Sequence, residues 1–321
     1  MTRPVVTVTR RLPAVVEREL AAAFDARLNE TDGPLSPECI GQALRESDAL
    51  LCTVTDRVDQ AMVEGGVRAR IIANYGVGYN HIDVAAMRAA GIVVTNTPDV
   101  LTDATADCAI MLMLMVARRA GEGERELRAG RWSGWRPTHL VGRAVSGRTL
   151  GIVGMGRIGR AVARRAHAGL GMRVLYHSRT PLAPREAAAL GAEARSLDAL
   201  LAESDFVSLH TPATRQTRHL IDRRALALMR PGAYLINTAR GDIVDEAALV
   251  EALAAGTIAG AALDVYEREP EVSAGLLGRD DVVLLPHLGS ATDESRTAMG
   301  RRALANLTAW FRGEPPPDRV T

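Results

Sequence analysis

Short apolar runs rich in β-branched residues alternate along this chain with alanine-rich stretches of helical period. In the N-terminal third, the pattern predicts strands over 5–9, 49–54, 71–73 and 92–95, and helices over 14–23, 59–64 and 82–90. The pattern restarts further on, with strands predicted over 150–153, 173–176, 206–209, 233–236, 258–265 and 282–285, and helices over 158–168 and 245–255. Such alternation is typical of parallel sheets covered by helices. The sequence therefore predicts the α/β class with two doubly wound units.

A long helix is predicted over 102–120, between the two units. Its most apolar part, 108–117, is about half of the roughly 20 residues that a membrane span needs. The first residues of the chain contain no uninterrupted apolar core of the signal-peptide kind. We therefore expect a buried helix in a cytoplasmic protein with no membrane partner.

Residues 121–147 are rich in glycine and arginine and contain Trp132 and Trp135. Two interpretations stay open for this segment: a structured surface loop, or an arm that packs on a partner subunit, because exposed tryptophans mark interfaces. The last predicted helix runs to about residue 312, with Ser290 and Thr292 as candidate N-caps. Its apolar face comprises Leu304, Leu307 and Phe311.

Composition narrows the function. The 321 residues have a formal net charge of +1 and only 3% aromatic residues, so the chain lacks the basic footprint and stacking platforms of nucleic-acid binding. All 39 basic residues are arginine, which excludes Schiff-base, pyridoxal-phosphate and Walker-A chemistry. Negatively charged ligands would therefore be bound by arginine, whose planar guanidinium group suits carboxylates and phosphates. The three cysteines lack metal-ligand spacing, and we expect no metal site.

A glycine motif follows the predicted strand 150–153 and opens a helix. Gly154, Gly156 and Gly159 form G-x-G-x-x-G, whose glycines permit a tight turn, close approach of a pyrophosphate, and packing of the helix on the strand. The next strand is followed by His177, Ser178, Arg179 and Thr180, with none of the acids that accept from a ribose hydroxyl in NAD sites. A serine and an arginine there suit a 2′-phosphate. We therefore predict NADP(H) as the preferred cofactor, with NAD(H) possible.

Three reactive side chains follow three strands of the second unit. Arg240, Glu269 and His287 each come after a predicted strand, so they emerge from the sheet edge that also carries the glycine turn. The guanidinium can hold a carboxylate or keto oxygen, and histidine is the natural acid near neutrality. A neighbouring glutamate favours the imidazolium until an alkoxide forms. This set predicts reduction of a 2-keto acid.

The first unit offers a second anion site. The strand 71–73 leads into a loop, 74–80, with glycines two apart whose backbone amides can face a small anion. We interpret this loop as the site of the substrate carboxylate; a plain turn between strand and helix is the alternative. His210, after another strand of the second unit, could line the cofactor groove.

The chain resembles the D-isomer-specific 2-hydroxyacid dehydrogenases, and among them the glyoxylate/hydroxypyruvate reductases. The matching stretches, in the family's order, are GVGYNHID, VVTNTPDVLTDATAD, GIVGMGRIG, HTPAT, INTARGDIVDEAAL, LDVYEREP and PHLGSAT. The resemblance covers nearly the whole chain. It implies a Rossmann nucleotide-binding domain, 99–287, inserted into a flavodoxin-like substrate-binding (catalytic) domain formed by 1–98 and 288–321.

The resemblance also implies roles for single residues. Arg240, Glu269 and His287 match the family's catalytic triad, and Val77 and Gly78 would offer amides to a substrate carboxylate that Arg240 also binds. Asp264 would support the nicotinamide side, and a homodimer would form through the nucleotide domains. The residues expected to contact the cofactor are Thr105, Gly154, Gly156, Arg157, Ile158, Gly159, Ser178, Arg179, Thr180, His210, Thr211, Pro212, Thr217, Thr238, Ala239, Asp264, His287 and Gly289.

The sequence thus predicts an oxidoreductase that transfers a hydride from NADPH to glyoxylate or hydroxypyruvate and yields the D-2-hydroxy acid. Two alternatives stay open. One is a 2-hydroxyacid dehydrogenase that uses NAD(H) and another or bulkier keto acid. The other is a cofactor-sensing, corepressor-like binding protein.

Overall fold

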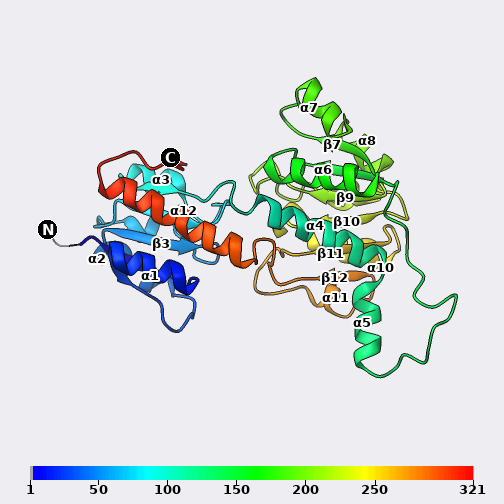
Figure 1. Cartoon of the computed structure of the whole chain (residues 1–321), viewed down its shortest axis with the longest axis horizontal. Helices are drawn as coiled ribbons and strands as arrows, with labels where there is room; N and C mark the ends of the chain where they lie inside the picture. Colours follow the sequence, from blue (N-terminus) through cyan, green and yellow to red (C-terminus); the bar gives the residue numbers. More distant parts are fainter. Residues whose placement is uncertain (1–2, 321) are drawn as a thin grey trace. The chain divides into compact units, whose positions relative to one another are not determined.

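The computed structural model describes residues 3–320, which form two compact α/β units. One unit comprises the described residues up to 101 together with those from 291 onward, and the other comprises residues 102–290. In Figure 1 the first unit combines blue and cyan elements with a red helix, because its last helix comes from the C-terminal end of the chain. The predicted class, α/β with two parallel sheets, is confirmed.

The first unit has a five-stranded parallel sheet in the order β2-β1-β3-β4-β5. Its strands are β1 (Val5–Val8), β2 (Asp25–Arg27), β3 (Ala49–Thr53), β4 (Ile71–Tyr75) and β5 (Val93–Thr95). Its helices are α1 (Ala14–Ala23), α2 (Pro37–Glu46), the 3₁₀ helix η1 (Gln60–Val63), α3 (Val84–Ala89) and α12 (Asp293–Phe311). This is the flavodoxin-like strand order, in which ligands bind beyond the carboxyl ends of the strands.

The second unit has a seven-stranded parallel sheet in the order β12-β11-β10-β9-β6-β7-β8. Its strands are β6 (Thr149–Val153), β7 (Arg173–His177), β8 (Ala192–Ala194), β9 (Phe206–Leu209), β10 (Tyr234–Asn237), β11 (Gly260–Leu263) and β12 (Val282–Leu284). Its helices are α4 (Thr102–Ala117), α5 (Ala120–Arg128), α6 (Arg157–Leu170), α7 (Pro184–Ala189), α8 (Leu197–Glu203), α9 (Arg223–Leu228), the 3₁₀ helix η2 (Gly241–Ile243), α10 (Glu246–Ala254) and α11 (Ala274–Leu277). The order from β8 to β11 is that of the Rossmann fold, with its switch point between β6 and β9.

Both faces of the larger sheet are buried, which explains why its strands are continuously apolar. In β9, Phe206 packs in the cluster on one face and Val207 in the cluster on the other. The helix α4 packs against α6 and the strands β10 to β12, with Leu112 and Met113 buried in the first cluster. Within residues 3–320, no helix combines the length and apolarity needed to cross a membrane.

The long helix predicted over 102–120 is α4, which ends three residues earlier, at Ala117. The backbone of Arg119 is left-handed, with φ of 53°, and this separates α4 from α5. The chain then returns to the end of α4, where the Arg143 N–H donates to the carbonyl of Ala117 at 2.8 Å. Gly142 lies so close to that carbonyl that a Cβ would be 2.3 Å from its oxygen. Part of the segment predicted as a loop is the helix α5, none of whose residues is buried, so it lacks the buried apolar stripe that predicts a helix.

Several elements of seven residues or fewer contain too few turns or alternations to give a periodicity signal: β2, β8, α7, α8, α9 and α11. The ten-residue helix α2 was also not predicted, although Ile40, Ala43 and Leu44 lie on one buried face. The strand predicted over 258–265 is shorter, and the helix predicted over 59–64 is the 3₁₀ helix η1. At the last helix, Thr292 rather than Ser290 is the N-cap, because its hydroxyl accepts from the Ser295 N–H at 3.1 Å. Leu307 is fully buried on the face predicted to be apolar.

Candidate functional site

In the glycine turn after β6, two of the three glycines have no room for a side chain and the third has space beside it. Gly154 has a positive φ of 100°, and a Cβ there would lie 2.6 Å from the backbone of His210. A Cβ at Gly159 would lie 2.2 Å from the Gly154 carbonyl oxygen. At Gly156, the N-cap of α6, such a Cβ would have no described atom within 4 Å. Packing therefore requires the outer glycines, and the middle one leaves the space that a pyrophosphate at a helix N-terminus needs.

The end of β7 carries hydroxyl groups and a guanidinium. Ser178 is half-buried, Arg179 and Thr180 are exposed, and none of these side chains bonds to another residue of the described chain. The acid on the neighbouring strand, Glu193, is bound by two arginines, and the hydrogen bond from Arg173 is the main cause that lowers its pKa to about 2. The three side chains after β7 are therefore available to a ligand.

The turn after β9 adjoins the glycine turn, since Gly154 packs on His210. The His210 Nε2 lies 2.8 Å from the hydroxyl oxygen of Ser208. Burial lowers the pKa of His210 to about 4, so its imidazole is neutral at pH 7. The predicted groove residues Thr211 and Pro212 follow directly. Thr217 braces them, because its hydroxyl donates to the Pro212 carbonyl at 2.6 Å.

Arg240 lies in a clamped turn between β10 and η2. The Asn237 side chain donates to the Arg240 carbonyl at 2.8 Å and accepts from the Ala239 N–H at 3.0 Å. Gly241 packs on the backbone of Tyr266, where a Cβ would lie 1.8 Å from the carbonyl carbon. Only glycine fits there, so the Arg240 turn is held against the residues that follow β11. Burial lowers the pKa of Arg240 from its ordinary value, yet a guanidinium stays charged at neutral pH.

His287 and Glu269 form a hydrogen-bonded pair. The His287 Nδ1 lies 2.8 Å from Oε2 of Glu269, whose Oε1 accepts from the Tyr266 N–H at 3.0 Å. Because an ionised carboxylate only accepts, Nδ1 carries the proton, and Nε2 is the nitrogen left for a substrate. The two side chains are 30% and 31% exposed, so the pair is reachable from solvent.

The surroundings of Glu269 keep it ionised. Burial alone would raise the pKa of Glu269, but the hydrogen bond and charge of His287, the Tyr266 amide and the Arg240 guanidinium together lower it below 4.5. A carboxylate with a lowered folded-state pKa stabilises the fold above its ordinary pKa, and this contribution is lost as the pH falls through the lowered value. Glu269 is therefore negative throughout the neutral range.

Asp264 holds the turn that carries His287. Its two carboxylate oxygens accept from the N–H groups of Leu288 at 2.6 Å and Gly289 at 2.7 Å, and its carbonyl accepts from the His287 N–H at 2.9 Å. These bonds maintain a positive φ of 56° at His287, a conformation that costs energy for a non-glycine residue. Burial raises the pKa of Asp264. Thr105 of α4 lies beside Gly289.

One buried hydroxyl in the second unit lacks a partner. Thr238 directly follows β10, and its Oγ1 is buried with no hydrogen-bond partner among the described residues. Buried polar atoms are normally paired, so an unpaired one at the carboxyl end of a strand fits a ligand that completes it. With the space at Gly156, this hydroxyl supports the fit of a dinucleotide to this edge.

Val77 and Gly78 lie in the first unit, in the turn after β4. Their N–H groups donate to no other residue within 3–320, so they are available to an anion. The predicted site residues thus fall into two sets. Arg240, Glu269 and His287 belong to the second unit with the residues predicted to contact the cofactor, and the 77–78 amides belong to the first.

Sequence reasoning missed the residues that hold the reacting groups in place. Asn237, Gly241 and the backbone of Tyr266 position Arg240 and Glu269 but carry no chemistry of their own. The sequence offered one signal for this support: Asn237 is a polar residue at the end of an otherwise apolar strand. Such a side chain can form hydrogen bonds with the backbone of the following turn.

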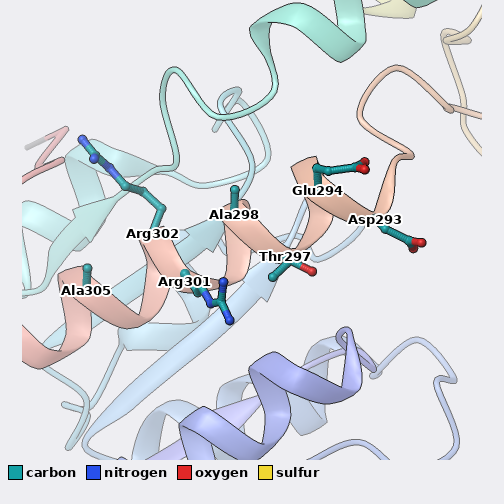
Figure 2. Close-up of a pocket in the computed structure, with 7 residues that line it drawn as sticks. All are labelled: Asp293, Glu294, Thr297, Ala298, Arg301, Arg302 and Ala305. Atoms are coloured by element: carbon teal, nitrogen blue, oxygen red, sulfur yellow. The ribbon is translucent and has the colours of Figure 1, made fainter.

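A separate hollow of about 700 Å³ lies along α12 in the first unit and contains none of the predicted site residues. Figure 2 shows Arg301 and Arg302 leaving different sides of this helix. Both guanidinium groups are already paired with carboxylates, Arg301 with Glu19 at 2.8 Å and Arg302 with Asp318 at 2.6 Å. Within residues 3–320, no group of histidine, cysteine and acidic residues could hold a metal ion.

Comparisons with known proteins identify relatives of the whole chain. A family model described as D-isomer specific 2-hydroxyacid dehydrogenase, NAD binding domain, matches residues 110–289. The glyoxylate reductases of Thermococcus onnurineus (strain NA1) and Pyrococcus furiosus are each 46% identical to this chain, over 99% of it and over 96% and 95% of their own lengths. The crystal structure of an NADPH-dependent glyoxylate/hydroxypyruvate reductase from Sinorhizobium meliloti, in complex with NADP and malonate, is similar with a TM-score of 0.86 at 36% identity, covering 100% of this chain and 97% of that one. The resemblance seen in the motifs is confirmed, and the chain belongs to the D-isomer specific 2-hydroxyacid dehydrogenase family.

Proposed function

We propose that this protein uses NADPH to reduce glyoxylate to glycolate and hydroxypyruvate to D-glycerate. The observation that carries the proposal is the His287–Glu269 pair, with 2.8 Å between Nδ1 and Oε2, at the sheet edge that also carries Arg240 and the glycine turn. The relatives named glyoxylate reductase, and the related structure named for both substrates, support this choice of keto acid.

The proposed chemistry divides among three side chains. When bound, the nicotinamide supplies the hydride. His287 donates a proton from Nε2 to the developing alkoxide, and the negative charge of Glu269 keeps the imidazole protonated until that moment. Arg240 holds the carboxylate or keto oxygen through charge-assisted hydrogen bonds, and Val77 and Gly78 bind the carboxylate through their amides.

The dinucleotide would be held along the carboxyl edge of the larger sheet. Gly154, Gly156 and Gly159 with the N-terminus of α6 would bind the pyrophosphate, and the unpaired Thr238 hydroxyl would complete its hydrogen bonding on the ligand. We assign the other predicted contacts to the same edge: Thr105, Arg157, Ile158, Ser178, Arg179, Thr180, His210, Thr211, Pro212, Thr217, Ala239, Asp264, His287 and Gly289. We also propose that the first unit binds the substrate and the second the cofactor.

A panel of substrates tests the proposal. Initial rates for glyoxylate, hydroxypyruvate, pyruvate and a bulky 2-keto acid, each with NADPH and NADH, give kcat/KM for every combination. We expect the highest values for glyoxylate and hydroxypyruvate with NADPH. A preference for the bulky acid with NADH would support the first alternative. Tight binding of NADPH without oxidation across the panel would support a corepressor-like role.

The preference for NADPH should depend on Arg179. Replacing Arg179 with alanine is expected to lower kcat/KM for NADPH by roughly 10- to 100-fold, because a hydrogen bond to a charged group contributes about 1.5–3 kcal/mol. The value for NADH should change little. Arg173→Ala, on the same strand but paired with Glu193, is the matched control. The assignment fails if the unmodified protein strongly prefers NADH, or if Arg179→Ala leaves the ratio of the two values unchanged.

We propose that α5 and the segment after it form a homodimer interface. Leu127, Trp132, Trp135 and Val141 expose from 51% to 82% of their surface, a concentration of apolar side chains typical of interaction sites. Figure 1 shows this segment extending away from the larger sheet. In sedimentation velocity, we expect the unmodified protein to form a dimer and the Trp135→Ser variant to be a monomer. A one-chain species of the unmodified protein at micromolar concentration would refute the proposal.

A further inference from the structure

In the turn after β4, three consecutive carbonyl groups accept hydrogen bonds from asparagine side chains. The Asn74 Nδ2 donates to the carbonyls of Gly76 and Gly78, both at 3.0 Å, and the Asn96 Nδ2 donates to the carbonyl of Val77 at 2.9 Å. Two amide groups from neighbouring strand ends thus bind three consecutive carbonyls. The sequence interpretation of this loop concerned only its glycines.

This arrangement fixes the direction of the next three N–H groups. In a trans peptide, the N–H of one residue points opposite to the carbonyl of the residue before it, and these peptides are trans. The N–H groups of Val77, Gly78 and Tyr79 therefore point away from the asparagines. None of the three donates to another residue of the described chain. Consecutive N–H groups that carry no internal hydrogen bond can donate to a bound anion.

The asparagines are themselves fixed. Asn74 is fully buried, and its Oδ1 lies 3.1 Å from Nε2 of His81. Because both Asn74 N–H groups are used on the turn, this oxygen is the acceptor and the histidine nitrogen carries the proton. The bonds of Asn74 thus leave its amide in one orientation.

Asn96 is anchored to the C-terminal segment of the chain. Its N–H donates to the Asp318 carbonyl at 3.2 Å. Asp318 is nearly buried; its carboxylate accepts from both sides of the Arg302 guanidinium, at 2.6 and 2.7 Å, and from the Asn306 side chain at 3.0 Å. The last residues of the chain therefore hold the strand end that supplies Asn96.

We propose that Asn74 and Asn96 are positioning residues that aim the N–H groups of Val77, Gly78 and Tyr79 at the carboxylate of the keto acid, with Asp318 holding Asn96 in place. The inference rests on the proposed function and adds to it the Tyr79 amide and the support behind the turn. A preorganised anion site loses no free energy in ordering its donors when the ligand arrives. Without the asparagines, the Val77 and Gly78 carbonyls would lose their hydrogen bonds, while the Gly76 carbonyl would keep the bond from the Thr97 N–H at 3.0 Å. The Gly78 and Tyr79 amides would then lose their fixed direction.

Steady-state kinetics of Asn96→Ala and Asn74→Ser test the inference. Each variant should raise KM for glyoxylate by about 10-fold, as the loss of hydrogen bonds of roughly 1.5 kcal/mol implies. We expect kcat to change less, and KM for NADPH to stay the same, because the predicted dinucleotide site belongs to the other unit. Asp318→Asn, which keeps the oxygen that accepts from Arg302, should give a smaller rise in KM.

Asn29→Ala is the matched control. The Asn29 side chain also donates to two backbone carbonyls of the first unit, those of Thr9 at 2.8 Å and Gly33 at 2.7 Å, but not to the turn after β4. It should lower the thermal midpoint as much as Asn96→Ala without raising KM for glyoxylate. An equal rise in KM in the control, a parallel rise in KM for NADPH, or an unchanged KM in Asn96→Ala would overturn the inference.

The inference can fail separately from the proposed function. If the unmodified protein reduces no keto acid, the proposed function fails, and calorimetric titration with oxamate tests the anion site directly. Weaker oxamate binding by Asn96→Ala than by the unmodified protein and Asn29→Ala would support the three-amide site. Equal binding by all three proteins, or no binding by the unmodified one, would overturn it.

Discussion

Replacing His287 with asparagine is expected to lower kcat/KM for glyoxylate by about 10²- to 10⁴-fold, the range typical for loss of a general acid. Asparagine is the substitution of choice because His287 has a positive φ, which asparagine tolerates better than most residues. The expected loss comes from kcat more than from KM, since the proton is needed only as the alkoxide forms. Initial rates at saturating NADPH measure both constants.

The control for this variant is His219→Asn. His219 also has a positive φ, of 48°, and its Nε2 lies 2.8 Å from a carboxylate, that of Glu267, in the same unit. It has no proposed part in the reaction, so kcat/KM should stay within roughly threefold of the unmodified value. If the two variants lose activity equally, the His287 imidazole is not the acid.

Glu269→Gln separates charge from hydrogen bonding at the same pair. Keto-acid reduction needs a protonated imidazole, and the negative charge of Glu269, whose pKa is lowered in the fold, favours that form. Without the charge, the alkaline limb of the pH profile for reduction should lie at lower pH than in the unmodified protein. The rate of the opposite reaction, oxidation of the hydroxy acid, should be higher at low pH in Glu269→Gln than in the unmodified protein. An unmoved limb would contradict the proposed role of Glu269.

Arg240→Gln is expected to produce the second-largest loss, about 10²- to 10³-fold in kcat/KM, as for removal of a single preorganised donor to a developing charge. Arg240→Lys, which keeps the charge but not the planar fork, should recover only part of this loss. Both variants should bind NADPH with unchanged affinity. Measured kcat/KM for glyoxylate within threefold of the unmodified value in Arg240→Gln would refute the role of this guanidinium.

Local physical chemistry explains what could be read from the sequence. The glycines of the turn are required by contacts between residues close in the chain, such as Gly159 against Gly154. The spacing of these glycines in the sequence therefore predicts the turn. The parallel sheets follow from alternating apolar and helical stretches, because both faces of each strand must be covered. Arg240, Glu269 and His287 could be proposed as the reacting groups because each follows a strand. The carboxyl ends of parallel strands lie at one edge of the sheet.

The elements that the sequence analysis did not predict also have physical explanations. The helix α5 was not predicted because none of its residues is buried, and elements of a few residues, such as β2 and α9, contain too few turns or alternations to show a period. The cap of α12 is Thr292 because backbone geometry, not residue type, decides which hydroxyl reaches an N–H. The sequence offers two equal candidates there.

By itself, the sequence determined the fold class, the family and the identity of the candidate reacting groups, since these depend on residue type and local spacing. Only the tertiary structure decided how those groups are held: the 2.8 Å contact of His287 with Glu269, the support of its turn by Asp264, and the orientation of the amides after β4 by Asn74 and Asn96. Each of these is a hydrogen bond whose length and direction depend on the packing of separate segments. Residue order along the chain does not encode such distances.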